Sequence, residues 1–112
     1  MSYNGQQQKF DVAVTGATTQ SAYAGVMAAV GRMKTKKVSE NAAVHMVNFE
    51  TKATLRMAGQ RWMVQVVDQA GTPHIVVTAT PMGITGLAYA DAKIASLAHD
   101  LFSVATSHAL AA

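Results

Sequence analysis

The side chains able to do acid–base, metal or nucleophilic chemistry are scattered along this sequence. The chain has no cysteine, which excludes disulfides, thiolate zinc sites, iron–sulfur clusters and cysteine nucleophiles. Metal sites favour ligands at short spacings, and the four histidines form no such cluster. The six carboxylates are as widely spaced, and no Gly-x-Ser-x-Gly elbow is present. The four histidines are His45, His74, His99 and His108, and the six carboxylates are Asp11, Glu40, Glu50, Asp68, Asp91 and Asp100.

This scatter predicts no metal site, no cofactor and no catalytic residue, so the sequence favours a protein that is not an enzyme. An enzyme whose site is assembled from distant residues is the remaining alternative. His45 and His74 fall on different expected strands, and folding could make them neighbours.

The segment from Val12 to Thr18, Val-Ala-Val-Thr-Gly-Ala-Thr, is similar to a nucleotide-binding motif. A strand, Thr-Gly-Ala-Thr and a helix resemble the opening of short-chain dehydrogenases. Dinucleotide binding needs further glycines, so that the backbone can approach the pyrophosphate. No glycine follows Gly16 before Gly25. We therefore interpret the segment as a strand end followed by a helix N-cap.

A basic cluster follows the first expected helix, and the net charge of the chain is +3. Cations at this place complement a helix C-terminus. A nucleic-acid-binding protein would add exposed aromatic residues or an arginine-rich helix, and this chain has only one Trp, three Tyr and three Phe. We interpret the cluster as a solvated surface, with an anionic surface or nucleic acid as the alternative partner. Its members are Arg32, Lys34, Lys36 and Lys37.

Composition favours one folded domain. Half of the 112 residues are hydrophobic and 13% are charged, which is unlike the composition of disordered chains. We expect a flexible polar tail at residues 1–8 and a single domain at residues 9–112. No run approaches the roughly 18 apolar residues of a membrane span. The polar N-terminus lacks the apolar stretch of a secretion signal, so we expect a cytoplasmic protein.

The elements that must position these residues follow from hydrophobic periodicity. Thr18, Thr19 and Ser21 are the candidate N-caps of a first helix that runs to about residue 33. Asp68 to Thr72 is expected to be a hairpin loop of four or five residues, and residues 81–86 a linker. Strands are expected at 9–15, 37–40, 44–51, 61–67 and 74–80, with 54–57 as an extension or a further short strand, and a long helix at 88–110.

Both expected helices carry apolar stripes at spacings of three and four residues. Gly25 and Gly31 in the first helix would let it lie close to a sheet. The stripes are Tyr23, Val26, Met27, Val30 and Met33 in the first helix, and Leu87, Ala90, Ile94, Leu97, Leu101, Val104 and His108 in the second.

The predicted fold class is α+β, in the order β-α-β(4)-α, with a mainly antiparallel sheet of four or five strands and both helices on one face. Alternation along the strands then turns Val64, Val66, Ile75 and Val77 toward the helices. Met63, Val67 and Val76 would face away and make the outer surface partly apolar. Because monomers rarely leave a large patch of that kind in water, these three residues are the candidate interface.

This element order resembles a shortened helix-grip domain, as in the Bet v 1 and START-like families, over residues 10–105. The matching features are the Phe-Asp-Val-Ala-Val strand at 10–14, the helix at 21–33, the Asp-Gln-Ala-Gly hairpin at 68–71 and the final helix. The order is equally similar to that of small uncharacterised bacterial domains. The helix-grip resemblance implies a ligand cavity closed by the C-terminal helix, with Trp62, Tyr89 and the Gly83–Gly86 linker at its mouth.

Two functions therefore follow from the sequence. The first is a non-enzymatic interaction module, a homo-oligomer or the binder of another partner through the outer sheet face. The alternative is a carrier of a small apolar ligand or lipid, with a pocket between the sheet and the long helix.

Overall fold

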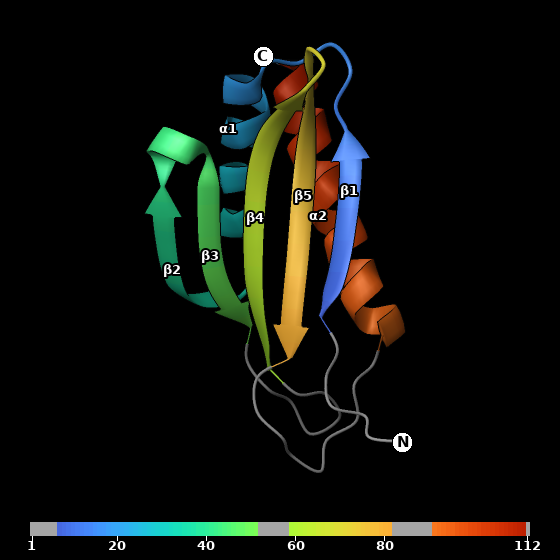
Figure 1. Ribbon diagram of the computed structural model, residues 1–112. Helices are drawn as coiled ribbons and strands as arrows, with labels where there is room; N and C mark the ends of the chain where they lie inside the picture. The colour runs from blue at the N-terminus through green and yellow to red at the C-terminus, as the bar shows by residue number, and fades with distance from the viewer. Residues whose placement is uncertain (1–6, 52–58, 82–90, 112) are drawn as a thin grey trace.

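The computed structural model describes residues 7–51, 59–81 and 91–111 as a five-stranded sheet with two helices on one of its faces (Figure 1). The strand order is β1-β5-β4-β3-β2, and every neighbouring pair is antiparallel. The expected fold class, element order and helix placement are confirmed. No described helix is long and apolar enough to cross a membrane. The elements are β1 (Gln8–Ala13), α1 (Thr19–Arg32), β2 (Thr35–Asn41), the 3₁₀ turn η1 (Ala42–Val44), β3 (Met46–Thr51), β4 (Gln60–Gln69), β5 (Thr72–Pro81) and α2 (Asp91–Ala111).

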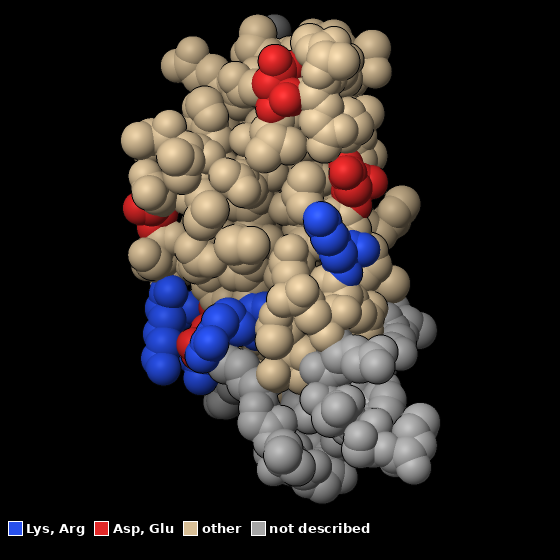
Figure 2. All heavy atoms as spheres, in the orientation of Figure 1, with Lys and Arg blue, Asp and Glu red and all other residues tan. Residues whose placement is uncertain are grey.

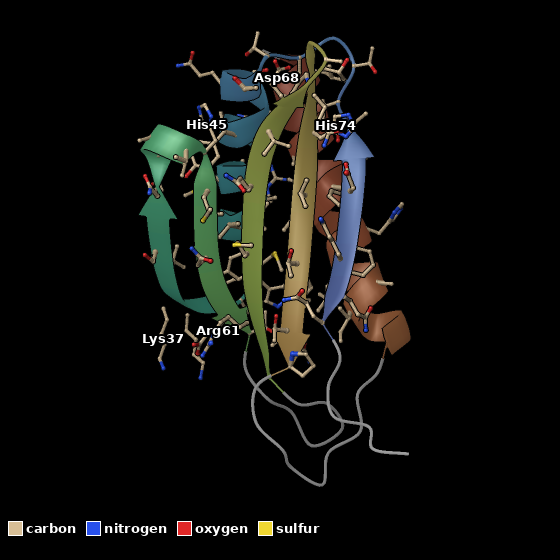
Figure 3. All side chains as sticks on the ribbon, viewed as in Figure 1. Lys37, His45, Arg61, Asp68 and His74 are labelled. Atoms are coloured by element: carbon tan, nitrogen blue, oxygen red, sulfur yellow. The ribbon has the colours of Figure 1, made fainter. Side chains whose placement is uncertain are left out.

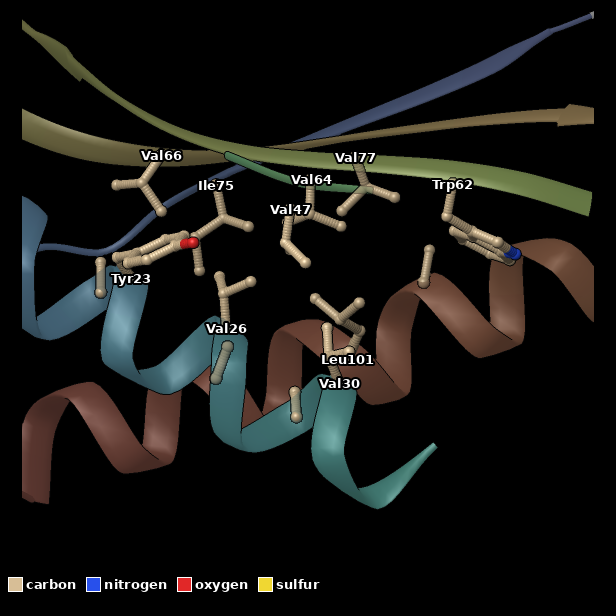
Figure 4. Packing of buried hydrophobic residues seen from close by; sticks show 14 of the residues in the cluster. Tyr23, Val26, Val30, Val47, Trp62, Val64, Val66, Ile75, Val77 and Leu101 are labelled. Atoms are coloured by element: carbon tan, nitrogen blue, oxygen red, sulfur yellow. The ribbon is translucent and has the colours of Figure 1, made fainter. Parts of the chain in front are cut away.

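The core lies between the helices and the inner face of the sheet, where the alternation of the strands places their apolar residues (Figure 4). The four residues expected to face the helices, Val64, Val66, Ile75 and Val77, are all buried. Helix α1 contributes its expected stripe to this cluster. In α2 the stripe is buried at Ile94 and Leu101, whereas His108 is exposed, so the prediction for His108 is wrong. Leu87 and Ala90 lie outside the described residues.

Helix α1 begins where the sequence predicts, because Thr18 is its N-cap. The Thr18 hydroxyl accepts a hydrogen bond from the Ser21 backbone N–H, and Ser21 Oγ accepts one from the Thr18 N–H. This reciprocal capping box satisfies two backbone donors that the first turn of the helix leaves unpaired.

The packing of Gly25 corrects one prediction. A Cβ at this position would lie 2.2 Å from the carbonyl oxygen of Ala105 in α2. The glycine therefore allows the two helices to approach each other, rather than bringing α1 close to the sheet. At Gly31 an added Cβ would meet nothing within 4 Å, so this glycine serves no close contact among the described residues.

The β4–β5 hairpin also differs from its prediction. The strands extend to Gln69 and from Thr72, which leaves a loop of two residues instead of four or five. Ala70 and Gly71 have φ values of 54° and 88°, as the tight primed hairpin turns require. An alanine in this left-handed conformation is uncommon, and for that reason the sequence did not indicate the turn.

The remaining boundaries shift by a few residues. Strand β2 runs from Thr35 to Asn41, longer than the expected 37–40, and β4 runs from Gln60 to Gln69, longer than the expected 61–67. The expected strand at 54–57, the linker after Pro81 and the first turn of the long helix at 88–90 lie outside the described residues.

Candidate functional site

The three residues predicted to face away from the helices lie together on the outer face of the sheet. Val76 of β5 is in register with Gln65 of β4, so it lies diagonally between Met63 and Val67, which are two residues before and after Gln65. Such diagonal neighbours are within reach of long side chains. Met63 is 38% exposed, and Val67 and Val76 are half-buried.

Strand β3 adds a fourth apolar side chain to this surface. Met46 is in register with Gln65. Because Val47 and Phe49 both face the core, the alternation of β3 turns Met46 to the outer face. We call Met46, Met63, Val67 and Val76 the outer apolar patch. The alternation of β3 around its buried Phe49 was the signal that could have identified Met46.

The residues between these apolar side chains are polar but uncharged. Asn48 and Thr78 flank Met63 in register, and Gln65 separates Met46 from Val76. Thr78 is only 9% exposed although it lies on the open face, which shows how closely its neighbours cover it. Figure 2 shows this face with a central area free of charged side chains and with charges toward its margins.

Two groups of charged residues lie at these margins. At one end of the sheet the Glu50 carboxylate lies 3.7 Å from Lys37 Nζ and 3.9 Å from Arg61 Nε (Figure 3). At the other end His74 Nδ1 lies 2.8 Å from Asp11 Oδ1. The Lys37 and Arg61 side chains are 72% and 67% exposed, and ion pairs with such exposed cations contribute little to stability. We therefore regard both groups as the rim of the surface.

The basic cluster is divided by the fold. Lys36 and Lys37 belong to β2, Lys34 lies in the connection before it, and Arg32 is the last residue of α1. Lys37 faces Glu50, whereas Arg32 lies beside residues of α2. All four are exposed, and Lys37 and Arg32 have different surroundings.

The histidines have separate surroundings. His45 has its ring 5.2 Å from that of Tyr23, while His74 pairs with Asp11, so the two expected strand histidines have different partners. Among the described residues, no three histidine or carboxylate side chains come together in a way that could hold a metal ion.

Tyr23 connects α1 to the edge of the sheet. Its hydroxyl donates to Glu40 Oε2 at 2.8 Å and lies 3.2 Å from the Met46 carbonyl oxygen as a second acceptor. Burial, and then the hydrogen bond and negative charge of Glu40, raise the pKa of Tyr23 well above its ordinary value. The phenol is therefore a neutral donor that holds β2 and β3 against the helix.

Trp62, a predicted ligand-binding residue, lies on the inner face of β4 and is fully buried. Its ring is stacked on Phe49, with centroids 6.0 Å apart, and Nε1 donates to Thr51 Oγ1 at 3.0 Å. Tyr89 and the Gly83–Gly86 linker, the other expected elements of the pocket mouth, lie outside the described residues.

Comparison with known proteins bears on the fold. No protein-family model and no curated protein matches the sequence. Among solved structures, the crystal structure of Ara h 8.0201, a Bet v 1 homologue, is similar to this chain with a TM-score of 0.68. The sequence identity is 8%, and the match covers 96% of this chain and 99% of the other. The predicted resemblance is confirmed, because the chain is similar in fold to the helix-grip domains of the Bet v 1 type.

Proposed function

We propose that this protein is a non-enzymatic interaction module that forms a homodimer through the outer apolar patch. The observation that carries the proposal is the position of Met63, 38% exposed between uncharged neighbours. The centres of protein interfaces are depleted of charged residues and enriched in methionine. A two-fold dimer uses the same patch on both copies, so one apolar face is enough to form the contact.

The energetics are consistent with such an association. Burial of apolar surface contributes about 25 cal/mol per Å², so a few hundred Å² would supply several kcal/mol before the cost of association. The inner face of the sheet cannot serve the same purpose, because Trp62, Val64, Ile75 and Val77 are already buried against the helices.

The test is the mass of the native protein in solution. Native mass spectrometry and sedimentation equilibrium are expected to show a dimer without added mass. Met63→Lys and Val76→Lys each bring two like charges close together in the centre of that dimer and are expected to give monomers. Leu110→Lys, at a side chain that is 51% exposed on α2, adds the same charge away from the sheet and should remain dimeric. A monomeric parent protein, or a dimeric Met63→Lys variant, would refute the proposal.

The second candidate is a carrier of a small apolar ligand, which the helix-grip fold favours. Trp62 points to the side of the sheet on which such a pocket would lie, and Tyr89 would line its mouth. The same mass spectrum distinguishes the two functions. A monomer that carries a co-purified small molecule would support the carrier and identify the chemical class of its ligand.

A further inference from the structure

A depression of about 320 Å³ lies between the two helices, and its lining combines residues distant in the sequence. Arg32 comes from the last turn of α1, and the other lining residues form one stripe along α2. The four polar residues that line the depression are exposed, whereas the residues of α1 and α2 that face the core are buried. The lining consists of Arg32, Ser103, Val104, Ser107 and His108.

The polar side chains of this depression have unused hydrogen-bonding capacity. In the part of the chain that the structure describes, no carboxylate forms an ion pair with Arg32. The Ser103, Ser107 and His108 side chains likewise have no hydrogen bond to another described residue. Lys37, from the same basic cluster, instead lies against Glu50. Four donors thus face one depression whose lining includes no carboxylate.

The chemistry of these donors points to an oxyanion. A guanidinium presents N–H groups in a planar fork that matches phosphate oxygens. Ser103 and Ser107 are four residues apart, so their hydroxyls lie on the same side of α2. His108 can donate a ring N–H to the same group. Donors from two helices suit the three terminal oxygens of a phosphate better than the two of a carboxylate.

The volume of the depression indicates how large its ligand can be. A water molecule occupies about 30 Å³ in the liquid, so a depression of about 320 Å³ has room for a phosphate and a short organic group. Val104, which is half-buried in the lining, offers that group an apolar contact.

We infer that the α1–α2 depression binds the phosphate of a small phosphomonoester, with Arg32 as its main charged contact and Ser103, Ser107 and His108 as further donors. The site lies on the helices, so it is independent of the proposed dimer surface. The same phosphate chemistry is present in a free metabolite and in the headgroup of phosphatidic acid.

The test is a titration of the full chain with glycerol 3-phosphate, followed by NMR amide shifts and calorimetry. Saturable shifts are expected at Arg32 and at residues 103–108. Arg32→Gln is expected to weaken binding by about tenfold or more, because it removes a charge-assisted hydrogen bond. The combined Ser103→Ala and Ser107→Ala change should also weaken binding.

Lys34→Gln is the matched control, since it removes one exposed positive charge two residues from Arg32 and should leave the affinity unchanged. Vesicles of phosphatidylcholine with phosphatidic acid form the second arm, and Arg32-dependent binding to them alone would assign the phosphate to a lipid. Equal losses in Arg32→Gln and Lys34→Gln, shifts elsewhere in the chain, or no binding in either arm would overturn the inference.

Discussion

At the scale of single residues, the Tyr23 hydroxyl connects three elements of the fold, α1, β2 and β3. It joins the helix to Glu40 of β2 and to the backbone of Met46 in β3. Tyr23 is only 8% exposed, so its hydroxyl must find a partner within the protein. The edge of the sheet that is farthest from β1 is thereby held to α1.

Removing this hydroxyl should destabilise the fold. Tyr23→Phe is expected to lower the free energy of unfolding by about 1 kcal/mol, the usual net value of one hydrogen bond. Glu40→Gln keeps an acceptor at the same place and should cost less. Urea denaturation at neutral pH measures both changes. An unaltered midpoint in Tyr23→Phe would show that these contacts add nothing to stability.

The contribution of Tyr23 should also depend on pH. Its pKa is raised in the folded protein, while the unfolded chain titrates near the ordinary value of 10.0. The stabilisation is therefore complete below pH 10 and is lost as the pH rises above it, because only the unfolded chain releases the proton there. The difference in unfolding free energy between the parent and Tyr23→Phe should therefore be smaller at about pH 11 than at about pH 8. A constant difference over this range would contradict the prediction.

At the scale of elements, the contact between α1 and α2 depends on Gly25. An added Cβ would lie 2.2 Å from the Ala105 carbonyl oxygen, and because that oxygen belongs to the backbone of α2, the helices would have to separate. Gly31 lies in the same helix, where a Cβ has free space. The two glycines thus form a matched pair, alike in residue type and helix and opposite in surroundings.

Gly25→Ala is expected to destabilise the protein by about 1–3 kcal/mol, as is typical of overpacked positions. Gly31→Ala should instead stabilise it by up to about 1 kcal/mol, because alanine favours the helix over the unfolded chain. Thermal or urea unfolding of the two variants checks both signs. Equal effects would show that the close approach of the helices is not what Gly25 provides.

At the scale of the whole molecule, the register of the sheet suggests how two copies would meet in the proposed dimer. Lys9 is in register with Thr78, and Asp11 with Val76, in adjacent rows of the outer face. Consider a two-fold axis that lies between the two sheets, runs perpendicular to the strands and passes between these two rows. Such an axis would place Lys9 of one copy opposite Asp11 of the other. Opposite charges at the rim would then fix the orientation of the pair.

Lys9→Asp is accordingly expected to weaken the dimer by up to about 30-fold, because the two-fold dimer contains this exposed ion pair twice and each pair contributes at most about 1 kcal/mol. Exchanging the two charges, with Lys9→Asp and Asp11→Lys together, should restore it. Sedimentation equilibrium at low and high salt measures both effects, and the difference between the variants should fade at high salt. Dimers of equal strength in all three proteins would exclude this orientation.

The sequence by itself determined the element types, their order and the faces of the central strands. These features depend on local geometry, since strands alternate every two residues and helices repeat every 3.6. Val64 and Ile75 could therefore be assigned to the core, and Met63 and Val76 to the outer face, before any strand order was known. The capping box at Thr18 and Ser21 is local in the same way. The positive φ at Ala70 is local too, but alanine carries no signal for it.

Only the tertiary structure decided which distant residues meet. His74 pairs with Asp11 across 63 positions of the sequence, Gly25 lies against Ala105, and Arg32 shares a depression with Ser103 and Ser107. Such contacts depend on strand register and on the packing of helices against one another. Both are set by the fit of many side chains at once, and periodicity within one segment does not encode that fit.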